Sequence, residues 1–177
     1  GWPHTVVEDY KSLDSHNIWL SFFNKIGCDL MKKENLTPQE MEDILNKKSG
    51  VYGMSRGVSV DFRDIENEAL AGGTHAQMAL DIYHYLTASY VAKCAVAMGG
   101  IDVLTFTAGV GEKGPISRKA ICDQLEFFGV KIDDEKNKIR GEEVEISAED
   151  SKVKVYVVPT NEELMIARGL RDVLSNP

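Results

Sequence analysis

The chain has 177 residues, a formal net charge of −8 at pH 7, 43% hydrophobic residues and 27% charged residues. These values are ordinary for one compact globular domain, and the net negative charge disfavours binding to nucleic acid phosphates. The sequence has no apolar run long enough to cross a bilayer and no signal-peptide pattern at its start, so we expect a cytoplasmic protein without membrane contact.

The cysteine and histidine spacings indicate neither a disulfide framework nor a zinc site. Cys28, Cys94 and Cys122 are odd in number and form no CxxC pair, which favours reduced thiols. Cys94 and Cys122 fall in helical patterns and are predicted to pack in the core. The four histidines, which show neither HxxxH nor HxH spacing, are His4, His16, His75 and His84. We therefore expect no zinc, and His84 is predicted to pack at the surface or at a boundary.

The first 35 residues carry weak structural signals. Residues 15–23 form a mixed apolar run that suits either a packed helix or a poorly specified tail. A helix start is predicted at residues 37–40. Threonine at the N-cap and glutamate three residues later satisfy unpaired backbone amides, and proline at the first helical position removes one. That helix is predicted to end at Gly50, and residues 51–64 are predicted to form a loop.

Two helices are predicted next, a short one over residues 65–71 and a long one that Thr74 caps. Two adjacent glycines separate them, and Gly99 ends the second helix. The apolar residues that recur at helical spacing in the long helix are Ala79, Ile82, Tyr83, Leu86, Tyr90, Cys94, Ala95 and Met98. This recurrence predicts one buried face.

A β-branched and aromatic run at residues 103–107 predicts a buried strand, and a glycine-rich loop at residues 108–112 follows it directly. A helix is predicted from Pro115 to about Phe128. A strand, a glycine loop and a helix in this order form an arrangement that binds phosphates or nucleotides.

The remainder of the chain is predicted to begin with a small solvent-facing hairpin, formed by residues 130–133 and 144–146 on either side of a loop. A strand over residues 152–158 then enters the core, because its alternating pattern becomes continuously apolar. Thr160 or Asn161 is predicted to cap a final helix.

No single motif identifies a ligand. The glycine turn at residues 109–111 fits neither the GxGxxG fingerprint nor a GK[ST] P-loop, which disfavours a Rossmann dinucleotide site. Such turns often serve only to redirect the chain. Asp61, Phe62 and Arg63 have two interpretations: a solvated loop, or a ligand site in which the ring or the guanidinium stacks on a base and the carboxylate binds a ribose.

The acidic pair at the start of the final helix has two interpretations, and the serine at the start of the helix before it has no catalytic partner in the sequence. Glu162 and Glu163 either complement the dipole of the final helix or help to hold magnesium beside phosphates. Ser117 has no histidine near it in the sequence. A nucleophile paired with a base is therefore not predicted, and hydrolase chemistry has no support.

Taken together, four segments make the chain resemble the acetate kinases. They are residues 46–50, 59–64, 106–112 and 159–164, and they occur in that family in this order and spacing. The likeness runs from about Leu36 to about Arg168 and covers less than half of a full-length member. It implies an α/β fold of the actin-like ATPase superfamily, with a partial ribonuclease-H-like domain that is helix-rich and has a reduced sheet. Residues 36–177 are thus expected to be the C-terminal part of the nucleotide-binding domain, and residues 1–35 a divergent segment.

The resemblance also implies a site for ATP or ADP with Mg²⁺. By position, it assigns Asp61, Phe62 and Arg63 to the adenosine pocket and Glu162 to magnesium. The residues that it assigns to the other side of the nucleotide are Gly109, Val110, Gly111, Glu112 and Lys113. The family reaction is reversible transfer of the γ-phosphoryl group of ATP to acetate, which gives acetyl phosphate and ADP and depends mainly on positioning and charge neutralisation.

Two departures from the family pattern bear on activity. Lys113 and Gly114 replace the asparagine and small residue that usually follow the GxGE motif, so the lysine either reaches a phosphate or points to solvent. The family's transition-state arginine would fall near Ile18 or Trp19, where the sequence does not match, and the family's N-terminal domain has no counterpart here. We therefore expect no catalytic residue and no turnover in this chain alone, with acetate binding only when the N-terminal region is present.

Only two parallel strands, over residues 103–107 and 153–158, are expected to remain of the domain's sheet. Exposed strand edges favour pairing with another chain, and family members dimerise through this domain, so a homodimer is expected. Three functions stay open: a phosphotransferase fragment that retains nucleotide affinity, a non-catalytic remnant or oligomerisation module, and a fragment of a propionate or butyrate kinase.

Overall fold

The computed structural model describes residues 15–175, and the side chains of residues 15–24, 162, 172 and 173 lie outside that description. The chain divides into two compact units, the first ending at Gly57 and the second beginning at Val58. The boundary that the sequence suggested at residue 36 marks where the family resemblance begins, and so it differs from this division by compactness. Among the described helices, none combines the length and the apolar character that a membrane span requires.

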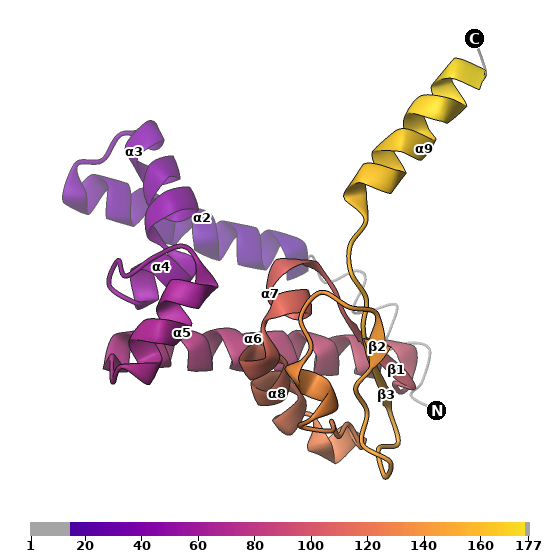
Figure 1. The fold of residues 1–177 in the computed structure, drawn as a ribbon. Helices are drawn as coiled ribbons and strands as arrows, with labels where there is room; N and C mark the ends of the chain where they lie inside the picture. The colour runs from indigo at the N-terminus through magenta and orange to yellow at the C-terminus, as the bar shows by residue number, and fades with distance from the viewer. Residues whose placement is uncertain (1–14, 176–177) are drawn as a thin grey trace, which may run out of the picture. The chain divides into compact units, whose positions relative to one another are not determined.

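The first unit is helical (Figure 1). Its elements are α2 (Ser15–Glu34), α3 (Pro38–Asp43), the π-helical turn η1 (Ile44–Lys48) and α4 (Gly50–Met54). The predicted helix start is confirmed as a capping box: the Glu40 amide donates to Thr37 Oγ1 at 3.3 Å, and the Thr37 amide donates to Glu40 Oε2 at 2.8 Å. Gly50 has a φ of +59°, as expected of the glycine that ends the α3–η1 run.

The loop predicted for residues 51–64 is wrong at both of its ends. Helix α4 occupies the start, because a left-handed Gly50 lets the chain turn and begin a new helix. Helix α5 (Phe62–Leu70) occupies the end and begins three residues earlier than predicted. Asp61 is the reason: its side chain accepts a hydrogen bond from the Arg63 amide at 2.9 Å and thereby caps the helix.

Helix α6 (Thr74–Met98) is the longest helix of the second unit, and α5 and α8 (Pro115–Asp123) both pack on it. Its first residue is Thr74, with Gly73 as an N-cap that makes no side-chain bond, so the predicted threonine cap is wrong. Gly99 adopts a φ of +79° and ends α6 where the sequence predicted.

The buried face of α6 differs from the predicted one. The buried residues are Ala76, Ala79, Leu80, His84, Ala88 and Ala95. Leu86, Tyr90, Cys94 and Met98 were expected to be buried but are exposed, Tyr90 by 66% and Met98 by 67%. Apolar residues lie on more than one side of α6, so their spacing alone does not identify the side that packs on the core.

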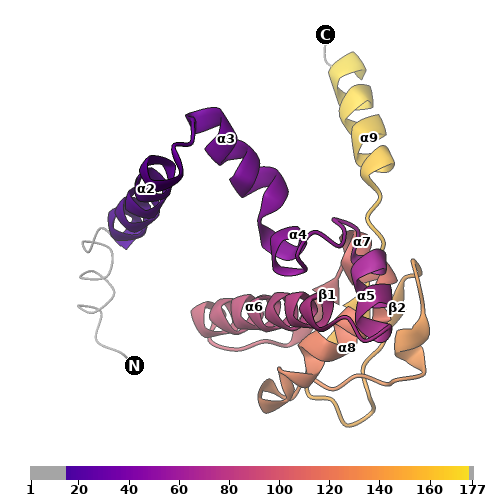
Figure 2. The same cartoon turned by 90° about the vertical axis from the view of Figure 1, so that its left-hand side faces the viewer.

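The sheet has the strand order β1-β3-β2. Strands β1 (Val103–Phe106) and β3 (Lys154–Val157) are parallel, with Leu104 opposite Val155, which confirms the predicted parallel pair. The sequence did not predict that the short strand β2 (Val144–Glu145) adds to β3 in the antiparallel direction. Figures 1 and 2 show these strands beside α6 and α8.

The main core lies between the sheet and these two helices. Its buried residues are Ala88, Phe106, Ile121, Cys122, Leu125, Val130, Ile146, Val153, Val155 and Val157. An antiparallel bridge between Ile132 and Ser147 confirms that the two segments of the predicted hairpin pair, but Val130 and Ile146 are fully buried, so the predicted solvent-facing position is wrong. Val130 instead forms a parallel bridge with Val153, which extends the sheet into the core.

Two short turns and a longer helix also belong to the second unit. Helix α8 ends at Asp123, and a 3-10 turn, η2 (Glu126–Phe128), replaces the end of the helix predicted to reach Phe128. A second 3-10 turn, η3 (Lys136–Lys138), lies within the predicted loop. The last helix is α9 (Glu162–Ser175), and the predicted Asn161 cap is confirmed by a 3.0 Å bond from the Leu164 amide to Asn161 Oδ1.

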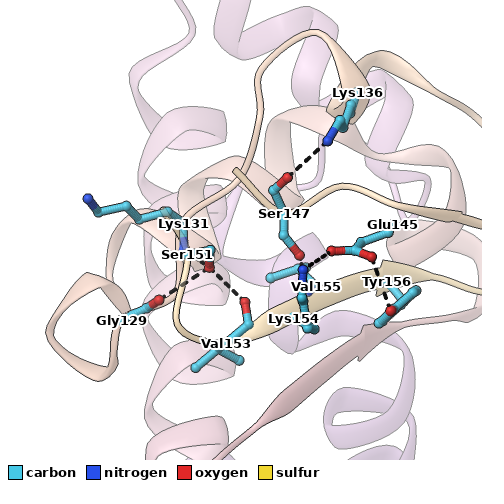
Figure 3. A network of polar contacts seen from close by, with 10 residues as sticks. All are labelled: Gly129, Lys131, Lys136, Glu145, Ser147, Ser151, Val153, Lys154, Val155 and Tyr156. Carbon is cyan, nitrogen blue, oxygen red and sulfur yellow. Dashed lines mark hydrogen bonds and ion pairs between the residues drawn. The ribbon is translucent and has the colours of Figure 1, made fainter. Parts of the chain in front are cut away.

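A polar network fastens β3 to its neighbours (Figure 3). The Val155 amide donates to Ser147 Oγ at 2.7 Å, and Ser151 Oγ donates to the Val153 carbonyl at 2.6 Å. Glu145 on β2 accepts from Lys154 Nζ at 2.7 Å and from the Tyr156 hydroxyl at 3.2 Å. These bonds hold the start and middle of β3, and the Val158 amide, which donates to the Phe106 carbonyl at 2.9 Å, holds the chain just before the segment at 159–161 that reaches the site.

Candidate functional site

A cleft between α5 and α7 (Ala108–Lys113) gathers most of the residues that the sequence analysis selected. Its volume is about 520 Å³, within the usual range for sites that bind small molecules. The residues that line it are Val60, Asp61, Phe62, Arg63, Glu66, Gly109, Val110, Lys113 and Gly114. We call this cleft the α5–α7 pocket.

The glycine-rich segment is a short helix, α7, rather than the predicted loop. It begins directly after β1, at Ala108, which has a φ of +59°. This left-handed conformation is uncommon for a residue with a side chain, and it turns the chain sharply out of the sheet. The Ala108 amide donates to Thr160 Oγ1 at 2.9 Å, so the segment after β3 holds the turn in place.

Glu112 ties α7 to the same threonine. Its Oε1 accepts from both the amide and the hydroxyl of Thr160 at 2.6 Å, and the side chain of Glu112 is only 8% exposed. These hydrogen bonds, first the one from the hydroxyl and then the one from the amide, lower the pKa of Glu112. The Thr160 hydroxyl has one proton and gives it to Glu112, so Thr107 Oγ1 is the donor in its 3.1 Å contact with Thr160.

Arg118 is fully buried and binds the backbone carbonyls of α7. Its Nη1 donates to the carbonyls of Gly111 and Glu112 at 2.8 and 2.9 Å. Its Nε donates to Asn137 Oδ1 at 2.8 Å, and its Nη2 donates to the carbonyls of Asn137 and Ile139 at 2.6 and 2.8 Å. All five N–H groups of the guanidinium are therefore used. Burial lowers the pKa of Arg118, and the charge of Arg140 adds to this effect.

Asp61 and Arg63 form a hydrogen-bonded ion pair at the edge of the pocket. Arg63 Nη2 lies 2.6 Å from Asp61 Oδ2, and Arg63 Nε lies 3.1 Å from Asp61 Oδ1. The side-chain and backbone hydrogen bonds from Arg63 lower the pKa of Asp61 to about 2. Phe62, between them, packs edge-on against Tyr83 with ring centroids 4.6 Å apart. The pair presents a planar cation and the ring gives the pocket an apolar wall.

The structure brings together six of the predicted site residues, from two segments distant in the sequence. Asp61, Phe62, Arg63, Gly109, Val110 and Lys113 all line the α5–α7 pocket. Gly111 and Glu112 do not line it, because Gly111 faces the backbone of Phe106 and Glu112 binds Thr160. Glu162 begins α9, but its side chain lies outside the described part of the chain.

Three further residues line the pocket and were not among the predicted site residues: Val60, Glu66 and Gly114. Glu66 follows Phe62 by four residues on α5, so helical spacing places both on the same face. This signal would have found Glu66 once the start of α5 was known.

A second hollow of about 490 Å³ lies against the other side of α7. Its lining residues are Ala108, Gly109, Glu112, Lys113, Thr160, Asn161 and Glu163. Gly109 and Lys113 belong to both hollows, so a ligand that crosses α7 would contact them. Within the described residues, no three or more histidine, cysteine or acidic side chains form a group that could hold a metal by themselves.

Ser117 on α8 does have a histidine partner, in contrast to the sequence-based expectation. His84 Nε2 lies 3.0 Å from Ser117 Oγ, and the two residues are 4% and 1% exposed. The fold of α6 against α8 brings them together from 33 positions apart. Their burial prevents this serine from attacking a dissolved substrate, so the pair is no exposed nucleophile. His84 is a core residue, not the surface or boundary residue predicted.

Comparisons with known proteins agree on one family. A family model described as the acetokinase family matches residues 25–168, which extends the likeness upstream of Leu36. Acetate kinase of Thermotoga petrophila is 58% identical over 147 residues, which are 82% of this chain and 36% of that protein. Acetate kinase of Dictyoglomus turgidum is 58% identical over 139 residues, which are 78% of this chain and 34% of that protein.

Solved structures give the same result. Acetate kinase of Porphyromonas gingivalis matches with a TM-score of 0.77 and 44% identity, over 85% of this chain and 38% of that one. A propionate kinase from Francisella tularensis subsp. tularensis matches with a TM-score of 0.73 and 33% identity, over 81% and 36%. The chain thus spans little more than a third of the length of these relatives. The helix-rich partial fold with a reduced sheet, expected from the sequence, is confirmed.

Proposed function

The chain belongs to the acetokinase family, and on that premise we propose that it carries the adenosine-binding side of a nucleotide cleft. In the full-length protein, the proposed reaction is reversible transfer of the γ-phosphoryl group of ATP to acetate. The observation that carries this proposal is the α5–α7 pocket, which joins residues 60–66 to residues 109–114 in one cavity of about 520 Å³.

The chemistry of the pocket suits a nucleoside. Phe62, Val60 and Val110 offer apolar surface to a flat base, and the Arg63 guanidinium offers a plane that stacks or donates. Gly109 has open space where a Cβ would lie, so the backbone of α7 is accessible to a close ligand. Lys113 provides a positive charge where α7 borders both hollows, which suits phosphate groups.

Magnesium fits the second hollow. Mg²⁺ usually takes one or two carboxylates and completes its shell with phosphate oxygens and water, so a group of three acidic residues is not needed. Asn161 and Glu163, the neighbours of Glu162, both line this hollow. We therefore propose that Glu162 holds the ion beside the phosphates. When bound, the ion neutralises phosphate charge during transfer.

We propose that this chain alone does not turn over. Phosphoryl transfer depends on several positioned charges, and loss of one donor commonly lowers the rate by a factor of about 10² to 10³. The family groups that bind acetate and stabilise the transition state have no counterpart among the residues of the α5–α7 pocket. We propose that residues outside this chain choose between acetate and propionate; solved structures of relatives with either name match this chain.

Calorimetric titration with MgADP tests the proposal. We expect saturable binding that Arg63→Ala weakens by a factor of about ten, because the variant loses the guanidinium that stacks on the ligand or donates to it. Arg56→Ala is a matched control, because Arg56 is also exposed and does not line the pocket. Absence of heat at millimolar MgADP, or equal affinity of the Arg63→Ala variant, would contradict the proposal.

A self-associating module is a second candidate, and the exposed apolar residues of α6 favour it. These residues are Met78, Tyr85, Leu86, Tyr90, Val96 and Met98. Together with the half-exposed Val103 of edge strand β1, they offer surface for a second copy of the chain. We propose a homodimer through this surface. Light scattering that gives a dimer mass, reduced to a monomer by Tyr90→Glu, would support it, and a monomer at 100 µM or so would oppose it. The cytoplasmic location expected from the sequence remains a prediction.

A further inference from the structure

Glu112 and Thr160 join the two chain segments that follow the parallel strands β1 and β3. The amide and the hydroxyl of Thr160 both donate to Glu112 Oε1 at 2.6 Å. The hydroxyl oxygen of Thr160 accepts in turn from the Ala108 amide at 2.9 Å, and Thr107 Oγ1 lies 3.1 Å from it. We call these four contacts the Glu112–Thr160 clasp.

The clasp determines how far apart these two segments lie. Within the described part of the chain, it accounts for every hydrogen bond between residues 107–113 and residues 159–163. The last backbone bond before it runs from the Val158 amide to the Phe106 carbonyl at 2.9 Å. Because the side chain of Glu112 is only 8% exposed, water has little access to compete for its carboxylate.

The same two segments form the second hollow, of about 490 Å³. All of its lining residues come from α7 and from residues 160–163. Asn161 follows the clasp directly, and its Oδ1 accepts from the Leu164 amide at 3.0 Å, which caps α9. A shift of Thr160 therefore moves the start of α9, with the backbone of Glu162, relative to α7.

We propose that Glu112 is a positioning residue for the phosphate and magnesium end of the nucleotide, and that it acts through Thr160 rather than by touching the ligand. This inference rests on the proposed function, in which the base binds in the α5–α7 pocket and Mg²⁺ in the second hollow. An ion that one or two carboxylates share with phosphate oxygens needs these groups at a fixed distance. The clasp supplies that distance, because it holds the α7 side of the hollow against the α9 side.

Calorimetry on the whole chain with three ligands tests this role: adenosine, ADP with EDTA, and MgADP. We expect magnesium to strengthen ADP binding to the native chain by a factor of about ten or more, a usual size for coupling between two ligands. Glu112→Ala opens the clasp, so this magnesium factor should fall to about two or less, while adenosine binds as it does to the native chain. Glu149→Ala also removes one carboxylate, but Glu149 is exposed and lines neither hollow, so this control should retain the native factor.

Three milder variants separate positioning from direct contact with the ion. Glu112→Gln keeps an oxygen that accepts from Thr160, and Thr160→Ser keeps both donors, so each should keep the magnesium factor within about twofold of the native value. Thr160→Val leaves the carboxylate in place but removes the hydroxyl, and it should lower the factor about threefold. If Glu112 bound the ion itself, Glu112→Gln would lose the factor and Thr160→Val would keep it, and that result would overturn the inference.

The outcomes also separate this inference from the proposed function. Adenosine and MgADP that bind without a magnesium factor, or a native factor in Glu112→Ala, would refute the positioning role and leave the adenosine side standing. An equal loss of all three affinities in Glu112→Ala would show a purely structural role and refute it too. If Glu112→Ala does not fold, Thr160→Val decides. If neither adenosine nor MgADP binds to the native chain, the proposed function fails and the inference fails with it.

Discussion

Arg118→Lys tests whether the buried guanidinium supports the wall of the pocket. Arg118 is fully buried and donates five hydrogen bonds, four of them to backbone carbonyls. A lysine keeps the charge but has at most three N–H donors, all on one nitrogen, so it cannot reach all five acceptors. At least two buried acceptors would lose their partner. Since each such loss costs about 1–3 kcal/mol, the expected decrease in the free energy of unfolding is about 3–5 kcal/mol.

Native-state hydrogen exchange is the suitable assay, because it reports the stability of the second unit separately from the first. The amides of Val155 and Val157 lie in the buried strand β3 and should show the loss of protection directly. The thermal midpoint should fall by about 10 °C in parallel.

Lys119→Met is the matched control for this experiment. Lys119 is the next residue on α8, but it is about half exposed, and its ion pairs with Asp123 and Asp134 lie at the surface. Surface pairs of this kind contribute at most about 1 kcal/mol. An Arg118→Lys effect no larger than that of Lys119→Met would refute the view that Arg118 holds α7 and the 137–139 segment together.

Three further predictions concern the site itself. Gly109→Ala should leave the thermal midpoint unchanged, because a Cβ there meets no atom within 4 Å. Calorimetry should nevertheless show that this variant binds MgADP more weakly. Equal binding would exclude a close approach of the ligand to α7. Arg63→Ala should return the pKa of Asp61 from about 2 toward 3.8, as followed by carboxyl NMR, and an unmoved titration would contradict the pair. The lowered pKa of Glu112 stabilises the fold at pH values above 4.5, the unfolded value, and this stability is lost as pH falls through the folded pKa. Thr160→Val should therefore remove part of the stability at pH 7 and flatten its decline below pH 4.5 in urea titrations at several pH values; a parallel pH profile would count against the bond.

The sequence predicted the starts of α3, α8 and α9 and the parallel strands because their signals are local. The order Thr37, Pro38 and Glu40 is sufficient to cap α3 without help from distant residues. The β-branched run of β3 is consistent with a strand that helices cover, whereas the strand predicted to be buried at residues 103–107 is only partly so, because Val103 and Thr105 of the edge strand β1 are exposed. The pairing of residues 61–63 with residues 109–113 came from the family resemblance, and no local pattern contains it.

The failures arise where contacts between distant segments decide the structure. The glycine segment 108–112 has the composition of a loop, but Thr160 and Arg118 supply the hydrogen bonds that hold it as a helix. Val130 and Ile146 alternate with polar residues as in an exposed hairpin, yet both are buried by the core. Sequence spacing gave no reason to join His84 to Ser117, because only the packing of α6 on α8 brings them together.

Chemical-shift mapping of the isotopically labelled chain with MgADP tests most directly whether this chain carries the adenosine side of the cleft. We expect saturating shift changes to concentrate in the backbone amides of residues 60–66 and 109–114, the two segments that line the α5–α7 pocket. Amides on the far side of the sheet, such as those near Ser151, should stay unchanged. Saturating changes that leave both pocket segments unaffected, or no changes at millimolar MgADP, would contradict the account.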